Sequence, residues 1–240
     1  MRSFARGPLA KLESLCYIIY MAARNTVKQY LQNGYYHLYN RGVEKRIIFQ
    51  DAQDYSVFLS YLKEYLLSKN EKELHERLSD ETISSKEKDK ILKLLRLNNF
   101  SEEISLLAYC LMPNHFHFFV KQKNPNSIDK FINSLCTRYS MYFNTKYKRV
   151  GSLYQGVYKA VLITNEAQFL HVSRYIHRQA IKIDKPSSYE EYLGLRKTEW
   201  VKPEEILSYF SKSNPSLSYE NFVKQEDDYE ILKNLTLEDD

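Results

Sequence analysis

The chain has 240 residues, of which 43% are hydrophobic, so it can bury one substantial core, and we expect one compact domain with additions. It contains no run of roughly eighteen uncharged apolar residues, which excludes an ordinary membrane-spanning helix. Its three cysteines have no short metal-ligand spacing, which excludes a disulfide framework and a zinc ribbon and favours a reducing cytoplasm.

The net charge of +5 hides a split along the chain. Residues 225–240 carry seven acidic side chains and one lysine, which leaves 34 basic against 23 acidic residues elsewhere. Between Lys121 and Lys182, eleven basic residues face only two acids, Asp129 and Glu166. On charge alone, a solvated basic surface is as good an explanation as a polyanion partner. The tyrosines among these charges favour the partner, because unpaired bases stack on such rings.

Residues 1–20 have basic residues followed by a brief apolar run, as a signal peptide does. Tyr17 and Tyr20 interrupt the apolar part, and no convincing small-residue cleavage pattern precedes Met21. We therefore expect residues 1–20 to be an extension outside the fold, with Met21 as the working start.

The first predicted elements are a strand and a helix. Residues 34–42, "GYYHLYNRG", alternate through aromatic and β-favouring residues and end at a glycine, which predicts a strand and a turn. Asp51 is a suitable N-cap for the helical pattern that follows it to about residue 70. Residues 69–100 are rich in Lys, Glu, Ser and Asp, and we interpret them as a charged helical insertion.

A hairpin should follow the insertion. Residues 104–112 and 115–122 are apolar runs of β type, and Pro113 and Asn114 between them suit a tight turn. The second run contains the sequence "HFHFFV", so two histidines lie on the second predicted strand.

Two helices and a strand complete the pattern. Apolar residues recur at helical spacing over 127–147, and Ser127 is a candidate N-cap for this helix. Residues 157–163 alternate as a fourth strand, and Asn165 should cap a third helix that ends before Asp184.

The order strand, helix, strand, strand, helix, strand predicts an α+β fold: a ferredoxin-like, or RRM-like, four-stranded antiparallel sheet with helices on one face. The third helix is then appended to this unit, and the insertion interrupts it. We expect a catalytic domain over residues 30–182, followed by a C-terminal extension over 183–240 that ends in the acidic tail.

His115 and His117 are the first candidate site residues. Successive side chains of a strand point to opposite faces, so both histidines lie on one face while Phe116 points into the core. Two imidazoles at this spacing can bind one metal ion if a third ligand completes the set. A His-x-His pair in an apolar strand is more often structural, so the pair alone decides nothing.

The third predicted helix offers the missing groups. Tyr175 and Gln179 lie four residues apart and therefore share a helical face. Two imidazoles and one amide oxygen suit Mg²⁺ or Mn²⁺ completed by phosphate and water. Tyr175 would then point at the phosphodiester that the metal polarises, as a nucleophile. Each of these two residues has an ordinary structural explanation, and only the joint pattern carries weight.

Five segments of the chain form a combination that is typical of one family: "YYHLYNRG", "IFQDAQDY", "AYCLMPNHFHFFV", "RYSMYFNTKYKRVGSLYQGVYKA" and "SRYIHRQAI". On these segments the chain resembles the HUH-superfamily single-tyrosine transposases, and within them the REP-associated tyrosine transposases. The resemblance covers about residues 30–182 and has no counterpart for much of 70–100.

The resemblance implies that His115 and His117 are the family's metal pair, Tyr175 its nucleophile and Gln179 the remaining ligand. It also implies an enzyme that nicks and rejoins single-stranded DNA next to hairpin-forming repeats, with a divalent ion and no other cofactor. Many relatives have "IHLNPV" after the tyrosine where this chain has "IHRQAI", so no proline interrupts the helix here.

The remaining assignments are weaker. His37 is a candidate to support the metal ligands, although a buried structural histidine is equally reasonable. Two other functions stay open: an RRM-like nucleic-acid binder without catalysis, and a replication-initiator or relaxase-type nickase. We expect a cytoplasmic, nucleoid-associated protein without a membrane segment, and a homodimer is left open. Candidate phosphate contacts are Arg41, Arg138, Lys148, Arg149 and Lys159.

Overall fold

The structure is a computed structural model, and it describes residue 28 and residues 30–225. The predicted extension at 1–20, the start at Met21 and nearly all of the acidic tail lie outside the described residues. Within the described part, no helix is both long and apolar enough to cross a membrane.

The centre of the fold is a four-stranded antiparallel sheet with the order β2-β3-β1-β4. This order confirms the predicted ferredoxin-like arrangement, because the first and third strands lie in the middle. The fourth strand is shorter than the predicted 157–163. The strands are β1 (Tyr35–Arg41), β2 (Ile104–Met112), β3 (His115–Gln122) and β4 (Lys159–Leu162).

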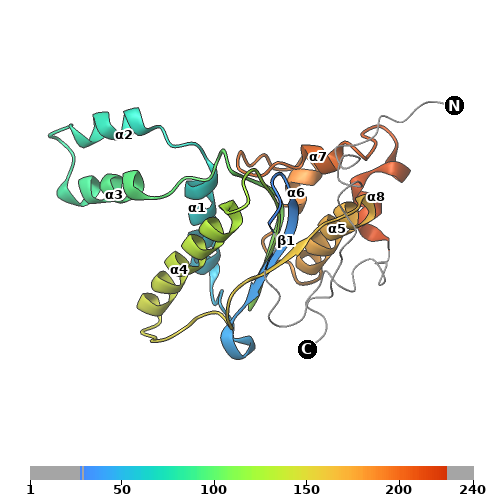
Figure 1. The fold of residues 1–240 in the computed structure, drawn as a ribbon, viewed down its shortest axis with the longest axis horizontal. Helices are drawn as coiled ribbons and strands as arrows, with labels where there is room; N and C mark the ends of the chain where they lie inside the picture. Colours follow the sequence, from blue (N-terminus) through green and yellow to red (C-terminus); the bar gives the residue numbers. More distant parts are fainter. Residues whose placement is uncertain (1–27, 29, 226–240) are drawn as a thin grey trace.

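Helices cover both faces of the sheet (Figure 1). Helices α1 (Ala52–Leu66) and α4 (Ser127–Lys146) lie on one face. Helix α5 (Glu166–Ile183) is the predicted appended helix, and it packs on the other face against β2 and β3. A short 3-10 helix, η2 (Val43–Lys45), follows β1.

Two predicted caps are present and one prediction is wrong. The side chains of Asp51 and Asn165 accept hydrogen bonds from backbone N–H groups in the first turns of α1 and α5. Ser127 is the first residue of α4, so Asn126 occupies the N-cap position, and the Ser127 hydroxyl donates to Glu103 over 2.6 Å. A side chain inside the helix does not face the free N–H groups of the first turn, as the side chain of an N-cap residue does.

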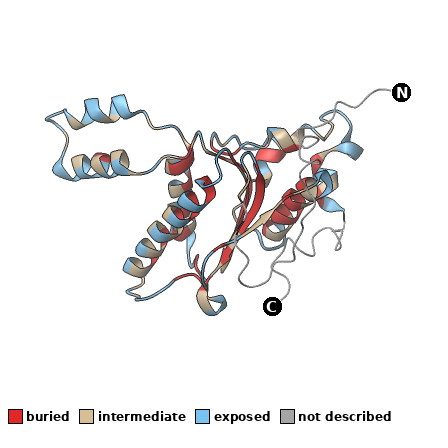
Figure 2. Cartoon of the chain, viewed as in Figure 1, coloured by how far each residue is buried: buried red, intermediate tan, exposed pale blue. Residues whose placement is uncertain are grey.

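The alternation of side chains along β1 and β3 divides the core in two. Tyr36, Leu38, Phe116 and Phe118 pack under α1 and α4, whereas Tyr35 and Phe119 pack under α5. Figure 2 shows that the strands and the helix surfaces facing them are the buried parts of the molecule. The sheet is therefore a shared wall between two separate hydrophobic clusters.

The predicted insertion forms two helices, α2 (Glu71–Leu78) and α3 (Ser85–Arg96), which project away from the sheet and are largely exposed (Figures 1 and 2). Its two ends meet. The side-chain amide of Asn99 donates to the carbonyl of Leu67 over 2.5 Å. The ammonium of Lys69 lies 2.6 Å from the carbonyl of Leu97 and also contacts the last carbonyls of α3.

The segment after α5 belongs to the same compact body. Tyr192, Ile206, Tyr219 and Val223 join the hydrophobic cluster under α5. The segment expected as a C-terminal extension therefore covers the appended helix. Its elements are α6 (Tyr189–Tyr192), α7 (Glu204–Leu207), the 3-10 helix η3 (Pro215–Leu217) and α8 (Tyr219–Lys224).

Candidate active site

The two histidines of β3 lie on the face of the sheet that α5 covers. Their ring centroids are 4.9 Å apart, and Phe116 between them is buried in the cluster on the opposite face. The pairing of β1 with β3 sets Arg41 opposite His115 and Tyr39 opposite His117. The predicted shared face of the histidines is therefore present.

Both histidines use Nδ1 for a contact within the protein. Nδ1 of His117 lies 2.9 Å from Nε2 of His37, and Nδ1 of His115 lies 2.6 Å from Oδ1 of Asn114. If the proton of each ring is on Nδ1, the Nδ1–H group donates in these contacts. Nε2 of each ring then carries a lone pair that can bind a cation. Nε2 of His117 is buried and has no hydrogen-bond partner in the described part of the chain.

The environment keeps these imidazoles neutral near pH 7. Burial, followed by the influence of His37 and His115, holds the pKa of His117 well below its usual value. Burial and the charge of Arg41 lower the pKa of His115 to about 4. A neutral imidazole is the form that can bind a cation.

Helix α5 brings Tyr175 to the histidines. The tyrosine ring lies 5.4 Å from the His117 ring and 6.0 Å from the His37 ring, centroid to centroid, and 4% of the residue is exposed. Gln179 follows one helical turn later, where it is half-buried. The helix continues through this region to Ile183 without a break, as the missing proline predicts.

The residue types at this site differ from those of an ordinary cluster of metal ligands. The described residues contain no group of three or more His, Cys, Asp or Glu side chains that could hold a metal ion. A set of two histidines and a glutamine is of a different kind, because its third donor is an amide oxygen. His37 contacts His117 through the ring nitrogen of His117 that is not Nε2, over 2.9 Å.

Two of the candidate phosphate contacts lie on the same face as the histidines. Arg41 is opposite His115, and its Nε donates to the side-chain oxygen of Gln155 over 3.1 Å. Lys159 on the edge strand β4 is opposite Tyr39, which is in turn opposite His117. Opposed residues of an antiparallel pair share a face, so both cations lie beside the candidate site.

The other three candidate contacts belong to α4 and the loop after it. Arg138 forms an ion pair with Glu64 at 2.6 Å and lies 3.7 Å from the centre of the Tyr61 ring. Arg149 donates to the side chain of Asn144 over 3.0 Å, and Lys148 is exposed just beyond the helix. The structure does not bring these three residues onto the face of the histidines.

One residue of α5 was missed by the sequence reasoning. His177 is fully buried; its Nδ1 lies 2.7 Å from the Tyr219 hydroxyl and its Nε2 lies 2.8 Å from the Ser188 hydroxyl. These contacts tie the tyrosine-bearing helix to α6 and α8. His177 shares the buried stripe of α5 with Ser173 and Ala180, and this spacing was the available signal.

Comparisons with known proteins place this geometry in context. Residues 76–179 match the family model described as "Transposase IS200 like". Among curated proteins, none matches the chain.

Two solved structures match the chain at low sequence identity. One is a REP-associated tyrosine transposase bound to a REP hairpin, 11% identical, with 82% of this chain and 97% of that chain covered and a TM-score of 0.47. The other is a putative transposase from Deinococcus radiodurans R1, 16% identical, with 67% and 98% covered and a TM-score of 0.27. The segment that matches the model of IS200-like transposases, residues 76–179, includes both histidines of β3 as well as Tyr175 and Gln179.

Proposed function

We propose that the protein is a metal-dependent enzyme that cleaves and rejoins single-stranded DNA, with Tyr175 as its nucleophile. The observation that carries the proposal is the juxtaposition of Tyr175 with His117, a buried histidine whose Nε2 has no hydrogen-bond partner in the described residues. A buried polar atom without a partner is costly, so its retention indicates a ligand.

The ligands that we propose for the divalent cation are Nε2 of His115, Nε2 of His117 and the side-chain oxygen of Gln179. The unpaired Nε2 atom and the neutral, partly amide donor set fit Mg²⁺ or Mn²⁺. When bound, the ion supplies positive charge that stabilises the negative charge developing on the phosphate oxygens. His37 would hold the His117 ring in the orientation that leaves Nε2 available.

The proposed reaction is a transesterification. The Tyr175 oxygen loses its proton and attacks the phosphorus, while the bond from phosphorus to the 3′ oxygen breaks. The products are a 5′-phosphotyrosine and a free 3′ hydroxyl, and this covalent bond conserves the energy that rejoining requires. Arg41 and Lys159 would hold neighbouring phosphates on the same sheet face.

The substrate that we propose is single-stranded DNA next to hairpin-forming repeats, as the resemblance of the sequence implies. An enzyme of this kind works in the cytoplasm at the nucleoid. A single chain carries all the proposed groups, so the proposal does not depend on a homodimer.

The test is formation of a covalent adduct. Full-length protein, a labelled single strand that contains a hairpin, and Mn²⁺ or Mg²⁺ should give a denaturant-resistant protein–DNA band that chelator prevents. The Tyr175→Phe variant should form none, whereas Tyr55→Phe, on the opposite face of the sheet, should react normally. An adduct that persists in Tyr175→Phe would reject the nucleophile, and binding without any adduct would indicate a non-catalytic binder.

A further inference from the structure

A polar groove lies on the face of the sheet that α1 and α4 cover, opposite the face of the candidate active site. It has a volume of about 310 Å³ and is formed by α4 and the loop that leads to β4. Its residues include Asn133, Thr137 and Ser140 of the helix and Tyr154 and Tyr158 of the loop. The volume lies at the low end of the range of small-molecule sites, which suits single nucleotides and is too small for a duplex.

The helix side of the groove is a stripe of uncharged side chains. Asn133, Thr137, Ser140, Met141 and Asn144 recur at helical spacing, and no charged residue is among the lining residues. The rim is apolar where Met141 and Val157 are 67% and 72% exposed. Amides, hydroxyls and apolar surface suit the edges and faces of nucleobases, whereas a phosphate requires cations.

Cations lie at the two ends of this stripe. Lys130 lies one turn before Asn133 on the same side of α4, and Lys148 lies just beyond Asn144; both are exposed. A groove without charge between two cations is complementary to bases in the middle and phosphates on either side.

A buried hydroxyl in the groove wall lacks an adequate partner. The Tyr154 hydroxyl has almost no exposed surface, and its polar neighbour in the described part of the chain is the Cys136 thiol, a weak hydrogen-bond partner. Burial raises the pKa of that thiol to about 12, so it stays neutral. A thiol partner leaves the Tyr154 hydroxyl with hydrogen-bonding capacity in the wall of the groove.

One loop separates the groove from the active site. Its backbone pairs with the end of β1, because the Gln155 N–H donates to the Arg41 carbonyl over 2.9 Å. The Gln155 side chain bonds to Arg41, which is opposite His115, while Tyr154 and Gly156 line the groove. A strand that leaves the candidate active site need only cross this loop to reach the groove.

We propose that this groove, defined by Asn133, Thr137, Ser140 and Tyr154, binds unpaired bases of the DNA strand that Tyr175 cleaves. The proposal rests on the proposed function for the identity of the strand. It assigns base recognition to a surface away from the metal ligands, so sequence preference and cleavage can be separated by substitution.

The experiment is a base-removal scan. Binding of full-length protein in chelator is measured by fluorescence anisotropy for single strands in which one base at a time is replaced by an abasic site. The wild-type protein should lose roughly fivefold or more in affinity at one or two positions and little elsewhere, because each stacked base contributes about this much.

Thr137→Glu should weaken binding of the intact strand and abolish the position-specific losses. Thr145→Glu is the matched control, because it adds the same charge to an exposed position of α4 outside the groove. Asn133→Glu should have the same effect as Thr137→Glu. Agreement between the two variants would show that the loss belongs to the groove and not to one substituted residue.

Two results would overturn the proposal. One is that affinity depends on the position of the abasic site in the same way in Thr137→Glu as in the wild type and in Thr145→Glu. The other is a loss of affinity in Thr137→Glu that is as large for a blunt hairpin without single-stranded flanks as for the intact strand. Such a result would assign the groove to duplex DNA. The adduct assay separates a wrong assignment of the groove from a wrong proposed function. If adducts form normally and no abasic position lowers the affinity, only the assignment of the groove is rejected.

Discussion

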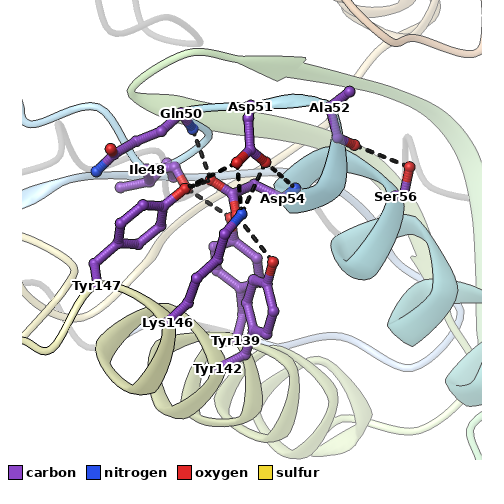
Figure 3. Close-up of polar contacts among 10 residues, drawn as sticks. All are labelled: Ile48, Gln50, Asp51, Ala52, Asp54, Ser56, Tyr139, Tyr142, Lys146 and Tyr147. Atoms are coloured by element: carbon purple, nitrogen blue, oxygen red, sulfur yellow. Dashed lines mark hydrogen bonds and ion pairs between the residues drawn. The ribbon is translucent and has the colours of Figure 1, made fainter.

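The two faces of the sheet each bury a polar cluster, and the clusters differ in how completely their atoms are paired. Under α1 and α4, the Asp54 carboxylate accepts hydrogen bonds from Lys146 at 2.7 Å, from the Gln50 N–H and Tyr147 at 2.8 Å, and from Tyr142 at 3.0 Å (Figure 3). Burial alone would raise the pKa of Asp54, but these four donors hold it below its usual value.

Under α5, His37 and His117 are both fully buried, and their cluster remains incomplete. Nε2 of His117 has no hydrogen-bond partner among the described residues. The comparison teaches that burial of a polar group does not indicate function. A completed network anchors the fold, whereas an incomplete one points to a missing ligand.

The largest expected effect concerns the completed cluster. Asp54→Ala should lower the free energy of unfolding by about 3 kcal/mol, because the Gln50 N–H and the hydroxyls of Tyr142 and Tyr147 lose their acceptor. Asp51→Ala removes an exposed N-cap that also contacts Lys146, and should cost much less. Urea unfolding measures both values. Equal losses in the two variants would contradict the special role of Asp54.

The second prediction concerns the pH dependence of the free energy of unfolding, to which the histidines under α5 and Asp54 contribute in different pH ranges. Burial lowers the pKa of His177 from its usual 6.5 to about 3, so between these values the unfolded chain binds a proton that the folded chain does not. Stability therefore falls as the pH drops below about 6.5, by about 2 kcal/mol for this residue at pH 5. His117 acts in the same direction, whereas Asp54 loses its contribution only below its usual pKa of 3.8.

This pH dependence can be measured by urea unfolding in chelator between pH 7 and pH 5. His177→Gln should reduce the slope but not abolish it, because His115 and His117 still contribute, and His75→Gln, at an exposed position of α2, should leave it unchanged. An unchanged slope in His177→Gln would refute the assignment.

The smallest expected effect concerns the support of the incomplete cluster. His37→Phe keeps a ring under α5 but removes the partner of His117 Nδ1, so Mn²⁺ affinity should fall roughly 10- to 100-fold. Calorimetric titration measures this, and excess Mn²⁺ should restore adduct formation. Tyr39→Phe is the control, because it changes another ring against His117 without touching Nδ1. Unchanged Mn²⁺ affinity in His37→Phe would limit His37 to a packing role.

The fold was largely predictable because its information is local. Alternation along β1 and β3 and the helical spacing in α1, α4 and α5 each follow from which face must be buried, and the caps at Asp51 and Asn165 mark where helices begin. The Ser127 cap failed because α4 begins at Ser127 itself and has Asn126 at its N-cap position, while the Ser127 hydroxyl contacts Glu103, a residue distant in sequence. Such a contact cannot be read from neighbouring residues.

The candidate site was predictable in part. The shared face of His115 and His117 follows from strand geometry, and the approach of Tyr175 required the family resemblance. The contact of His37 with His117 and the contacts of His177 with Ser188 and Tyr219 join residues 11 to 80 positions apart. These pairings depend on tertiary packing, which one sequence does not encode in any short pattern.

The closed base of the α2–α3 insertion has a consequence for the evolution of this chain. Leu67 and Asn99, at the two ends of the insertion, meet through a hydrogen bond. The distance between the end of α1 and the start of β2 therefore does not depend on how long the insertion is. Natural variation or laboratory deletion could therefore shorten, lengthen or replace residues 70–98 while α1 and β2 keep their positions. The projecting helices are an interchangeable part of the molecule, free to diverge faster than the sheet to which they are joined.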